Sequence, residues 1–178
     1  MKRVDLGPWL NNVGATRDSA RMSGEFDSFG RSFPKEEVLV SGSDVDGAAD
    51  NVQCEGQRIC FSEPVNIVGI RVIGACDGGT FCEPIGLVTV LGGVVQVSCG
   101  LTDWLASAPH FGETIAAFAT HVHEPSGDLI GPRPRLWCST AIVAPCRQQY
   151  VAVQLPVNPS FHLFAVELLM PGEQEGLA

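Results

Sequence analysis

The sequence predicts an all-β protein built as a two-sheet antiparallel β-sandwich of jelly-roll-like type. No segment shows the helical period of about 3.6 residues, whereas alternating and β-branched runs recur along the chain. The 20 glycines and 12 prolines are scattered between these runs, as expected for many short strands joined by turns. We expect one domain over residues 1–170, followed by a frayed tail at 171–178.

About nine strands are expected, and two segments indicate them most clearly. Apolar residues fill the segment 65–73, which predicts a strand that is buried on both faces. Residues 87–91 and 94–98 predict a hairpin, in which the Gly92-Gly93 pair supplies the positive φ angles of a two-residue primed turn. Further strands are expected at 38–41, 57–61, 115–123, 136–143, 150–155 and 161–169.

The charge balance excludes some classes of partner. The chain has 20 acidic and 11 basic residues, a formal net charge of -9, which repels phosphate backbones and anionic lipid headgroups. We therefore expect neither nucleic acid nor a membrane as a partner. The N-terminal residues lack the apolar stretch of a secretory signal, so we expect either a cytoplasmic protein or the trimmed part of a secreted one.

The seven cysteines leave two interpretations open. Three pairs that are close in the sequence could form disulfides that brace loops, which would leave Cys99 over: Cys54 with Cys60, Cys76 with Cys82, and Cys138 with Cys146. Alternatively, the cysteines are buried free thiols, which pack as small hydrophobic side chains. A zinc site built from cysteines is disfavoured because no C-x2-C pair occurs.

Five short stretches follow one another in a defined order. They are Trp9-Leu10-Asn11-Asn12-Val13-Gly14, the segment 26–34 ending in Ser-Phe-Pro, Asp50-Asn51-Val52 with Gly56-Gln57-Arg58-Ile59, Leu101-Thr102-Asp103-Trp104, and His162-Leu163-Phe164-Ala165-Val166. In these stretches the sequence resembles a β-sandwich module that is appended to bacterial glycoside hydrolases such as mannosidases and fucosidases, and the resemblance covers about residues 4–169. It implies a jelly-roll-like sandwich without catalytic residues, which contacts carbohydrate or braces a neighbouring domain.

Two tryptophans and several polar residues are the candidates for binding carbohydrate. Sugar recognition needs an exposed aromatic ring beside a few placed polar groups. Trp104 with Asp103 could form such a platform, Trp9 is a second indole, and burial in the core is the alternative for both tryptophans. The other polar candidates lie in a long surface loop expected at 11–34: Asn11, Asn12, Asp27 and Arg31.

The sequence His121-Val122-His123 is a candidate metal site that departs from this resemblance. On a strand both imidazoles point to one side, while Phe118 and Val122 would face the core. Imidazole is a common ligand of transition metals. The pair therefore supports an alternative function, a small metal-dependent jelly-roll enzyme, in which His110 or His162 could supply a third ligand.

A divalent calcium ion is a second metal alternative. Asp44, Asp46 and Asp50 could gather in one loop, although Ala48 and Ala49 occupy positions at which an EF-hand needs an oxygen ligand and a glycine. An acidic, solvated turn is the simpler interpretation.

No sequence motif of catalysis is present: there is no nucleophile elbow, phosphate-binding glycine loop or dinucleotide fingerprint. Together with the resemblance, which implies contact with carbohydrate, this favours a non-catalytic carbohydrate-binding module without a cofactor. A third alternative is a structural module whose open sheet face or edge joins copies of the chain into a homo-oligomer.

Overall fold

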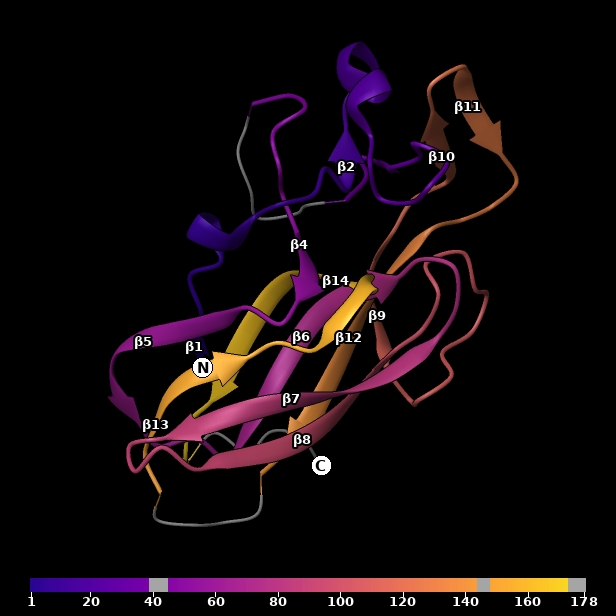
Figure 1. The fold of residues 1–178 in the computed structure, drawn as a ribbon. Helices are drawn as coiled ribbons and strands as arrows, with labels where there is room; N and C mark the ends of the chain where they lie inside the picture. Colours follow the sequence, from indigo (N-terminus) through magenta and orange to yellow (C-terminus); the bar gives the residue numbers. More distant parts are fainter. Residues whose placement is uncertain (39–44, 144–147, 173–178) are drawn as a thin grey trace.

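The fold is known from a computed structural model, which describes residues 1–38, 45–143 and 148–172. In this part the chain consists mainly of strands joined by turns (Figure 1). The helical elements there are two short 3-10 helices, η1 (Gly7–Trp9) and η2 (Asp18–Ser23). The prediction of an all-β fold is confirmed. Within these ranges no helix has the length and apolar character needed to span a bilayer.

The larger sheet has six antiparallel strands. Five of them follow the order β1-β14-β6-β12-β9, and β4 pairs with β14 beside this path. The strands are β1 (Lys2–Arg3), β4 (Val52–Glu55), β6 (Gly69–Cys76), β9 (Thr114–Phe118), β12 (Arg135–Ile142) and β14 (Val157–Leu169). The central strand β6 is largely buried because it is paired on both edges and covered by the core.

The smaller sheet has four antiparallel strands in the order β5-β13-β7-β8. The strands are β5 (Arg58–Val65), β7 (Phe81–Thr89), β8 (Val94–Leu101) and β13 (Tyr150–Gln154). Strand β8 contacts β12 and β6 of the larger sheet. Buried side chains of both sheets, such as Leu101 and Trp137, belong to one hydrophobic cluster, so the two sheets share a core.

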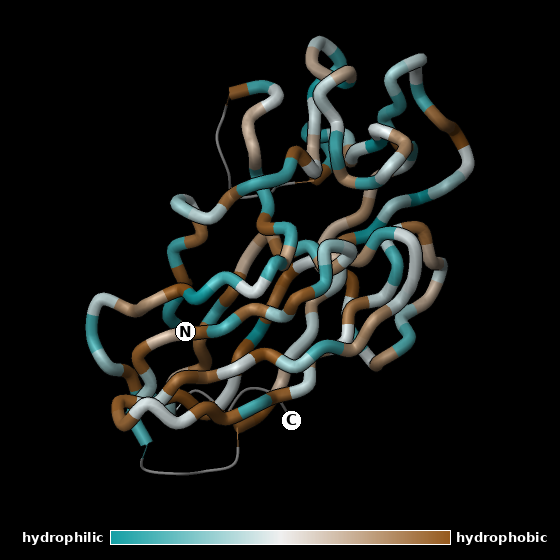
Figure 2. The backbone as a smooth tube through the Cα atoms, in the orientation of Figure 1, coloured by the Kyte–Doolittle hydropathy of each residue, from teal (hydrophilic) through white to brown (hydrophobic). Residues whose placement is uncertain are grey.

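Two small sheets lie at one end of the molecule, at the top of Figure 1. β2 (Ala15–Thr16) and β3 (Phe33–Pro34) pair in parallel, and β10 (His121–Glu124) forms an antiparallel hairpin with β11 (Gly127–Ile130). A bridge between Ser32 and His123 joins the two small sheets. Figure 2 shows that this end is richer in hydrophilic residues than the two large sheets below it.

Most of the expected strands are present, but two of them are divided. The expected strand 65–73 is wrong, because β5 ends at Val65 and β6 begins at Gly69 in the other sheet. The buried Ile67 lies in this connection, so hydrophobicity does not mark the break. The expected strand 115–123 is also interrupted, between β9 and β10. Phe118 does not face the core as expected but is 55% exposed on the edge strand β9.

The predicted hairpin forms between β7 and β8, but its turn differs from the expected one. The backbone N–H of Gly92 donates to the carbonyl of Thr89, and the N–H of Thr89 donates to the carbonyl of Gly93. The loop therefore has three residues, and Gly92 alone of the glycine pair has a positive φ, +83°. This is the geometry of a tight turn followed by a glycine bulge.

Three further expectations concern the opening loop, the cysteines and the strand at 38–41, and part of them falls outside the described residues. The segment 11–34 is not simply a surface loop, because Val13, Phe26 and Phe33 are buried. All six described cysteines are free thiols, so of the two interpretations left open the one with Cys54–Cys60 and Cys76–Cys82 disulfides is wrong there. Val38 is a buried bend, and the rest of the expected strand 38–41 lies outside the described residues, as do Cys146 and the tail 173–178.

Candidate functional site

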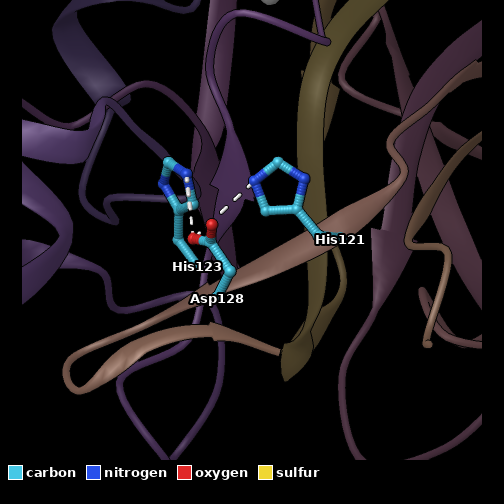
Figure 3. Close-up of side chains that lie close together, drawn as sticks. All are labelled: His121, His123 and Asp128. Atoms are coloured by element: carbon cyan, nitrogen blue, oxygen red, sulfur yellow. Dashed lines mark ion pairs between the residues drawn. The ribbon is translucent and has the colours of Figure 1, made fainter. Parts of the chain in front are cut away.

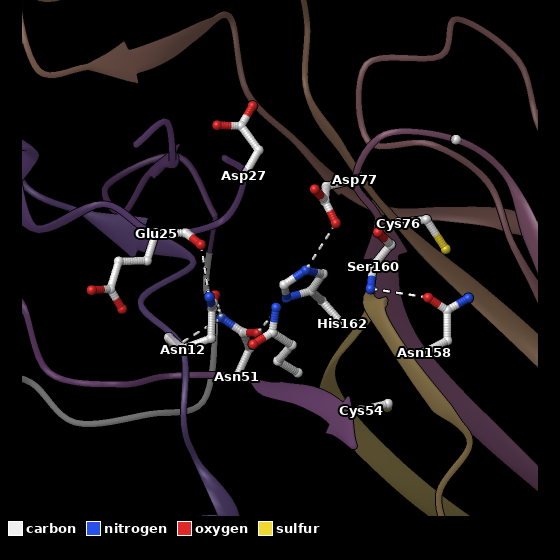
Figure 4. A network of polar contacts seen from close by, with 12 residues as sticks. Asn12, Glu25, Asp27, Asn51, Cys54, Cys76, Asp77, Asn158, Ser160 and His162 are labelled. Carbon is white, nitrogen blue, oxygen red and sulfur yellow. Dashed lines mark hydrogen bonds and ion pairs between the residues drawn. The ribbon is translucent and has the colours of Figure 1, made fainter. Parts of the chain in front are cut away.

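A buried polar network surrounds His162 on β14 (Figure 4). The Nδ1 atom of His162 lies 3.0 Å from Oδ1 of Asn51, and its Nε2 atom lies 3.3 Å from a carboxylate oxygen of Asp77. Asn51 in turn donates to Oδ1 of Asn12 (2.9 Å) and to Asp50 (3.1 Å). Buried polar groups are tolerated only when they are paired in this way.

Aromatic rings cover the other side of this network. The ring of Phe26 lies 4.5 Å from that of His162 and 4.7 Å from that of Trp104, measured between centroids. Phe33 contacts both Phe26 and Trp104 edge-on, at 5.1 Å. These are favourable aromatic geometries. Residues from all five sequence stretches thus meet in one cluster.

A glycine allows β14 to approach β6 at this point. A Cβ atom on Gly74 would overlap the carbonyl oxygen of His162. Next to it the register of β14 against β6 shifts between Leu163 and Ala165, which marks a bulge. Bulges re-aim side chains locally, and this one lies next to His162.

The structure corrects the role expected for Trp104. Its side chain is only 1% exposed and packs against both Phe26 and Phe33, so it cannot form an open platform for a sugar ring. Trp9, on η1, is 36% exposed. The expected partner of Trp104, Asp103, also has a local role: its two carboxylate oxygens accept the backbone N–H groups of Leu105 (2.8 Å) and Gly79 (3.0 Å).

The polar candidates of the opening segment likewise make hydrogen bonds within the protein. Asn11 exchanges two hydrogen bonds with the backbone of Gln53, and the buried Asn12 donates to the carbonyl of Glu25. Asp27 accepts from two backbone N–H groups and pairs with Arg31 at 2.6 Å. These residues shape the loop, which is the role that Asn and Asp commonly have in turns.

Phe29 and the mostly buried Arg31 form the rim of this cluster, and Phe29 is its exposed part. The guanidinium carbon of Arg31 lies 4.8 Å from the ring centroid of Phe29 and 5.8 Å from that of Trp104. Phe29 is 73% exposed. Burial raises the pKa of Asp103, and the negative charge of Asp77 acts in the same direction, against Arg31 and two backbone hydrogen bonds. Arg31 and Asp77 therefore each lie within electrostatic reach of Asp103.

A second cluster lies on one face of the β10–β11 hairpin. Its register pairs His123 with Asp128, and His121 lies two residues away on the same face. One potential ligand atom from each of these residues lies within 4.8 Å of the other two. The three side chains point toward one another (Figure 3). The expectation that both imidazoles share a face is thus met, and Asp128 joins them.

The two imidazoles are held in the same way. The Nε2 atoms of His121 and His123 lie 3.8 Å and 4.0 Å from the same oxygen of Asp128. On the opposite side of each ring, Nδ1 of His121 lies 3.3 Å from Glu37, and Nδ1 of His123 lies 3.0 Å from the hydroxyl of Thr16. Each ring therefore has an outer partner on Nδ1 and turns Nε2 inward.

The short helix η2 brings two opposite charges to this cluster. Arg21 donates to both Asp128 and Asp18 at 2.7 Å, and a carboxylate oxygen of Asp18 lies 3.3 Å from Nε2 of His123. The hydrogen bond from Arg21 is the largest of the effects that lower the pKa of Asp128. Burial is the largest cause that lowers the pKa of His123, and the charge of Arg21 adds to it.

The other expected metal ligands do not join this cluster. His162 belongs to the buried network, and the exposed His110 packs edge-on against Phe111. Of the calcium candidates, Asp50 accepts from backbone N–H groups at Gly14 and Ala15, Asp46 faces Arg17 and Ser19, and Asp44 lies outside the described residues.

Compared with known proteins, the chain matches no family model and no curated protein.

Several functional candidates were missed by sequence reasoning, for two reasons. Asp128 could have been found, because the turn residues Pro125-Ser126-Gly127 directly after His123-Glu124 indicate a hairpin that places it opposite His123. Arg21 and Glu37 carry no such signal. Arg21 reaches Asp128, and Glu37 reaches His121, from segments that are distant in the sequence.

Proposed function

We propose that this chain is a jelly-roll-like β-sandwich module that binds carbohydrate and does not catalyse a reaction. The observation that supports this best is the convergence of the five sequence stretches around His162, because those stretches carry the resemblance to modules of glycoside hydrolases. Each stretch alone is a weak motif, whereas their meeting in one cluster is what a shared function of the five would require.

In this proposal the buried network is the support and the exposed rim is the binding surface. The network orders the loop that carries Phe29 and Arg31, since Phe26 and Phe33 at its two ends pack on Trp104. Arg31 lies over one face of the Phe29 ring and leaves the exposed remainder to pack on the apolar face of a sugar. Hydroxyl groups of the sugar would then bind the guanidinium of Arg31 and the carboxylate of Asp77.

Two carboxylates near the rim, those of Asp27 and Asp103, support the non-catalytic part of the proposal. Both oxygens of Asp103 and both oxygens of Asp27 accept hydrogen bonds from the chain. A general acid or base needs a proton-transfer position that faces the substrate. These two side chains instead hold loops in place.

The test is calorimetry against a broad panel of glycans, followed by variants of the rim. We expect at least one glycan to bind, and Phe29→Ala to weaken it by about tenfold, which corresponds to about 1.4 kcal/mol. Phe118→Ala is the matched control, because this phenylalanine is also exposed but lies on β9. Trp9→Ala tests the partly exposed indole on η1. Absence of binding to the whole panel, or equal losses in both phenylalanine variants, would contradict the proposal.

A further inference from the structure

We propose that the β10–β11 hairpin and η2 together bind one divalent transition-metal ion of the zinc class through His121, His123, Asp128 and Asp18. This inference goes beyond the proposed carbohydrate function and does not depend on it. The ligand atoms of His121, His123 and Asp128 lie within 4.8 Å of one another on the hairpin. Asp18 approaches them from η2, about a hundred residues earlier in the sequence, with a carboxylate oxygen 3.3 Å from Nε2 of His123.

The orientation of the imidazoles is the first argument. In protein metal sites, a histidine ligand almost always donates a hydrogen bond from its other ring N–H to an oxygen acceptor, and this bond fixes the orientation of the ring. Here Glu37 has that role for His121, and Thr16 has it for His123, supported by a 2.7 Å contact between the hydroxyls of Thr16 and Ser32. Glu37 is itself held by the backbone N–H and the hydroxyl of Thr120.

The spacing of the inner atoms is the second argument. The distances of 3.8 Å and 4.0 Å from the two Nε2 atoms to Asp128 are too long for hydrogen bonds. Among the described residues, Nε2 of His121 has no hydrogen-bond partner. Metal bonds of about 2.0–2.2 Å place neighbouring tetrahedral ligand atoms about 3.3 Å apart. The ligand atoms of His121, His123 and Asp128 lie within 4.8 Å of one another, so the cluster needs to contract by at most about 1.5 Å.

Arg21 is the third argument, because it shows that the site already holds a positive charge. Its guanidinium bridges Asp128 and Asp18, at 2.7 Å from each. A metal ion would replace the guanidinium as the positive partner of the two carboxylates. Arg21 would then move toward solvent, to which its side chain is already 19% exposed. Glu37 adds a third carboxylate within reach of His121, so the surroundings remain favourable to a divalent cation.

The ligand types indicate the class of ion. Two imidazoles and two carboxylates suit zinc and neighbouring first-row metals, whereas calcium and magnesium prefer sites made of oxygen alone. Four protein ligands leave no open position, which is typical of a structural rather than a catalytic site. The ion would tie η2 to the hairpin, and ligand binding to the folded state would raise the melting temperature.

The test uses the full chain, freed of metal by dialysis against a chelator, and titrated with zinc chloride by calorimetry. Cobalt chloride serves as a second probe, because a tetrahedral site gives visible absorption. We expect one ion per chain and a higher melting temperature. Asp128→Asn, which changes an exposed side chain, and His121→Ala should each weaken binding at least about tenfold. His110→Ala is the matched control and should change nothing.

Two further variants separate this site from its alternatives. Arg21→Gln should bind zinc up to about fivefold more tightly, because the competing ion pair is removed; an equal or weaker affinity would overturn the displacement step. Glu37→Gln should weaken binding about tenfold although it removes no ligand. Loss of binding in a Cys60→Ser/Cys82→Ser variant would assign the ion to exposed thiols and overturn the proposal. So would a native protein that shows neither heat nor a thermal shift.

Discussion

His162 and Asn51 face each other across the centre of the molecule, with Nδ1 and Oδ1 at 3.0 Å and both side chains fully buried. The pair connects β14 to the segment before β4, and through Asn12 it reaches the N-terminal segment. Removal of either side chain would leave several buried polar atoms without hydrogen-bond partners, which lowers the free energy of unfolding.

We expect Asn51→Ala to lower the free energy of unfolding by about 2 kcal/mol or more, because His162 and Asn12 each lose a buried partner. Asn66→Ala, at an exposed position, should change it by less than about 0.5 kcal/mol. Urea unfolding followed by circular dichroism measures both. Similar stabilities of the two variants would show that the network contributes little.

The carboxylate of Asp77 makes the stability that this network contributes depend on pH. Burial acts to raise the pKa of Asp77, but the hydrogen bond and charge of His162 outweigh it, so the pKa lies below its usual value. The unfolded chain then takes up the proton first as the pH falls. The stabilisation is complete above the unfolded pKa of about 3.9 and is lost as the pH falls through the lower, folded pKa.

We therefore expect native protein to be more stable than Asp77→Asn at pH 6, and this difference to shrink as the pH falls below about 4. Urea unfolding at a series of pH values tests this. A difference that stays constant over that range would mean that the ionised form of Asp77 contributes nothing specific.

The two tryptophans expected to bind sugar should differ sharply in their effect on stability. Trp104→Ala removes a buried ring from contact with Phe26 and Phe33 and should cost about 3–5 kcal/mol. Trp9→Ala, at the surface, should cost less than about 1 kcal/mol. Thermal or urea unfolding gives both values. A mild Trp104→Ala variant would contradict its place in the core.

The cysteines should divide into reactive and protected thiols. Burial raises the pKa of Cys99 to about 11 and raises the pKa of Cys54 and Cys76 further, which suppresses the reactive thiolate. Cys60 and Cys82 are exposed. Treatment of the native protein with a thiol reagent, followed by peptide mass spectrometry, should label these two quickly and the buried three only on unfolding. If Cys76 and Cys82 can be labelled only after the protein has been treated with a reducing agent, the two residues form a disulfide after all.

The parts of the fold that follow from local pattern could be predicted. Alternation and β-branched residues indicated β12, β13 and most of β14, and the paired glycines indicated the β7–β8 hairpin. The same alternation placed His121 and His123 on one face. The turn at Ile67 was missed because its side chain is as buried as those of the strands it connects.

The sequence by itself determined that the chain forms strands, that they belong to antiparallel sheets, and that two imidazoles share a face, because the two-residue period of a strand is a local property. Only the tertiary structure decided that Trp104 is enclosed by Phe26 and Phe33, and that Arg21 reaches Asp128. Burial and charge pairing depend on which distant segments pack together, and this is set by the shared core rather than by neighbours along the chain.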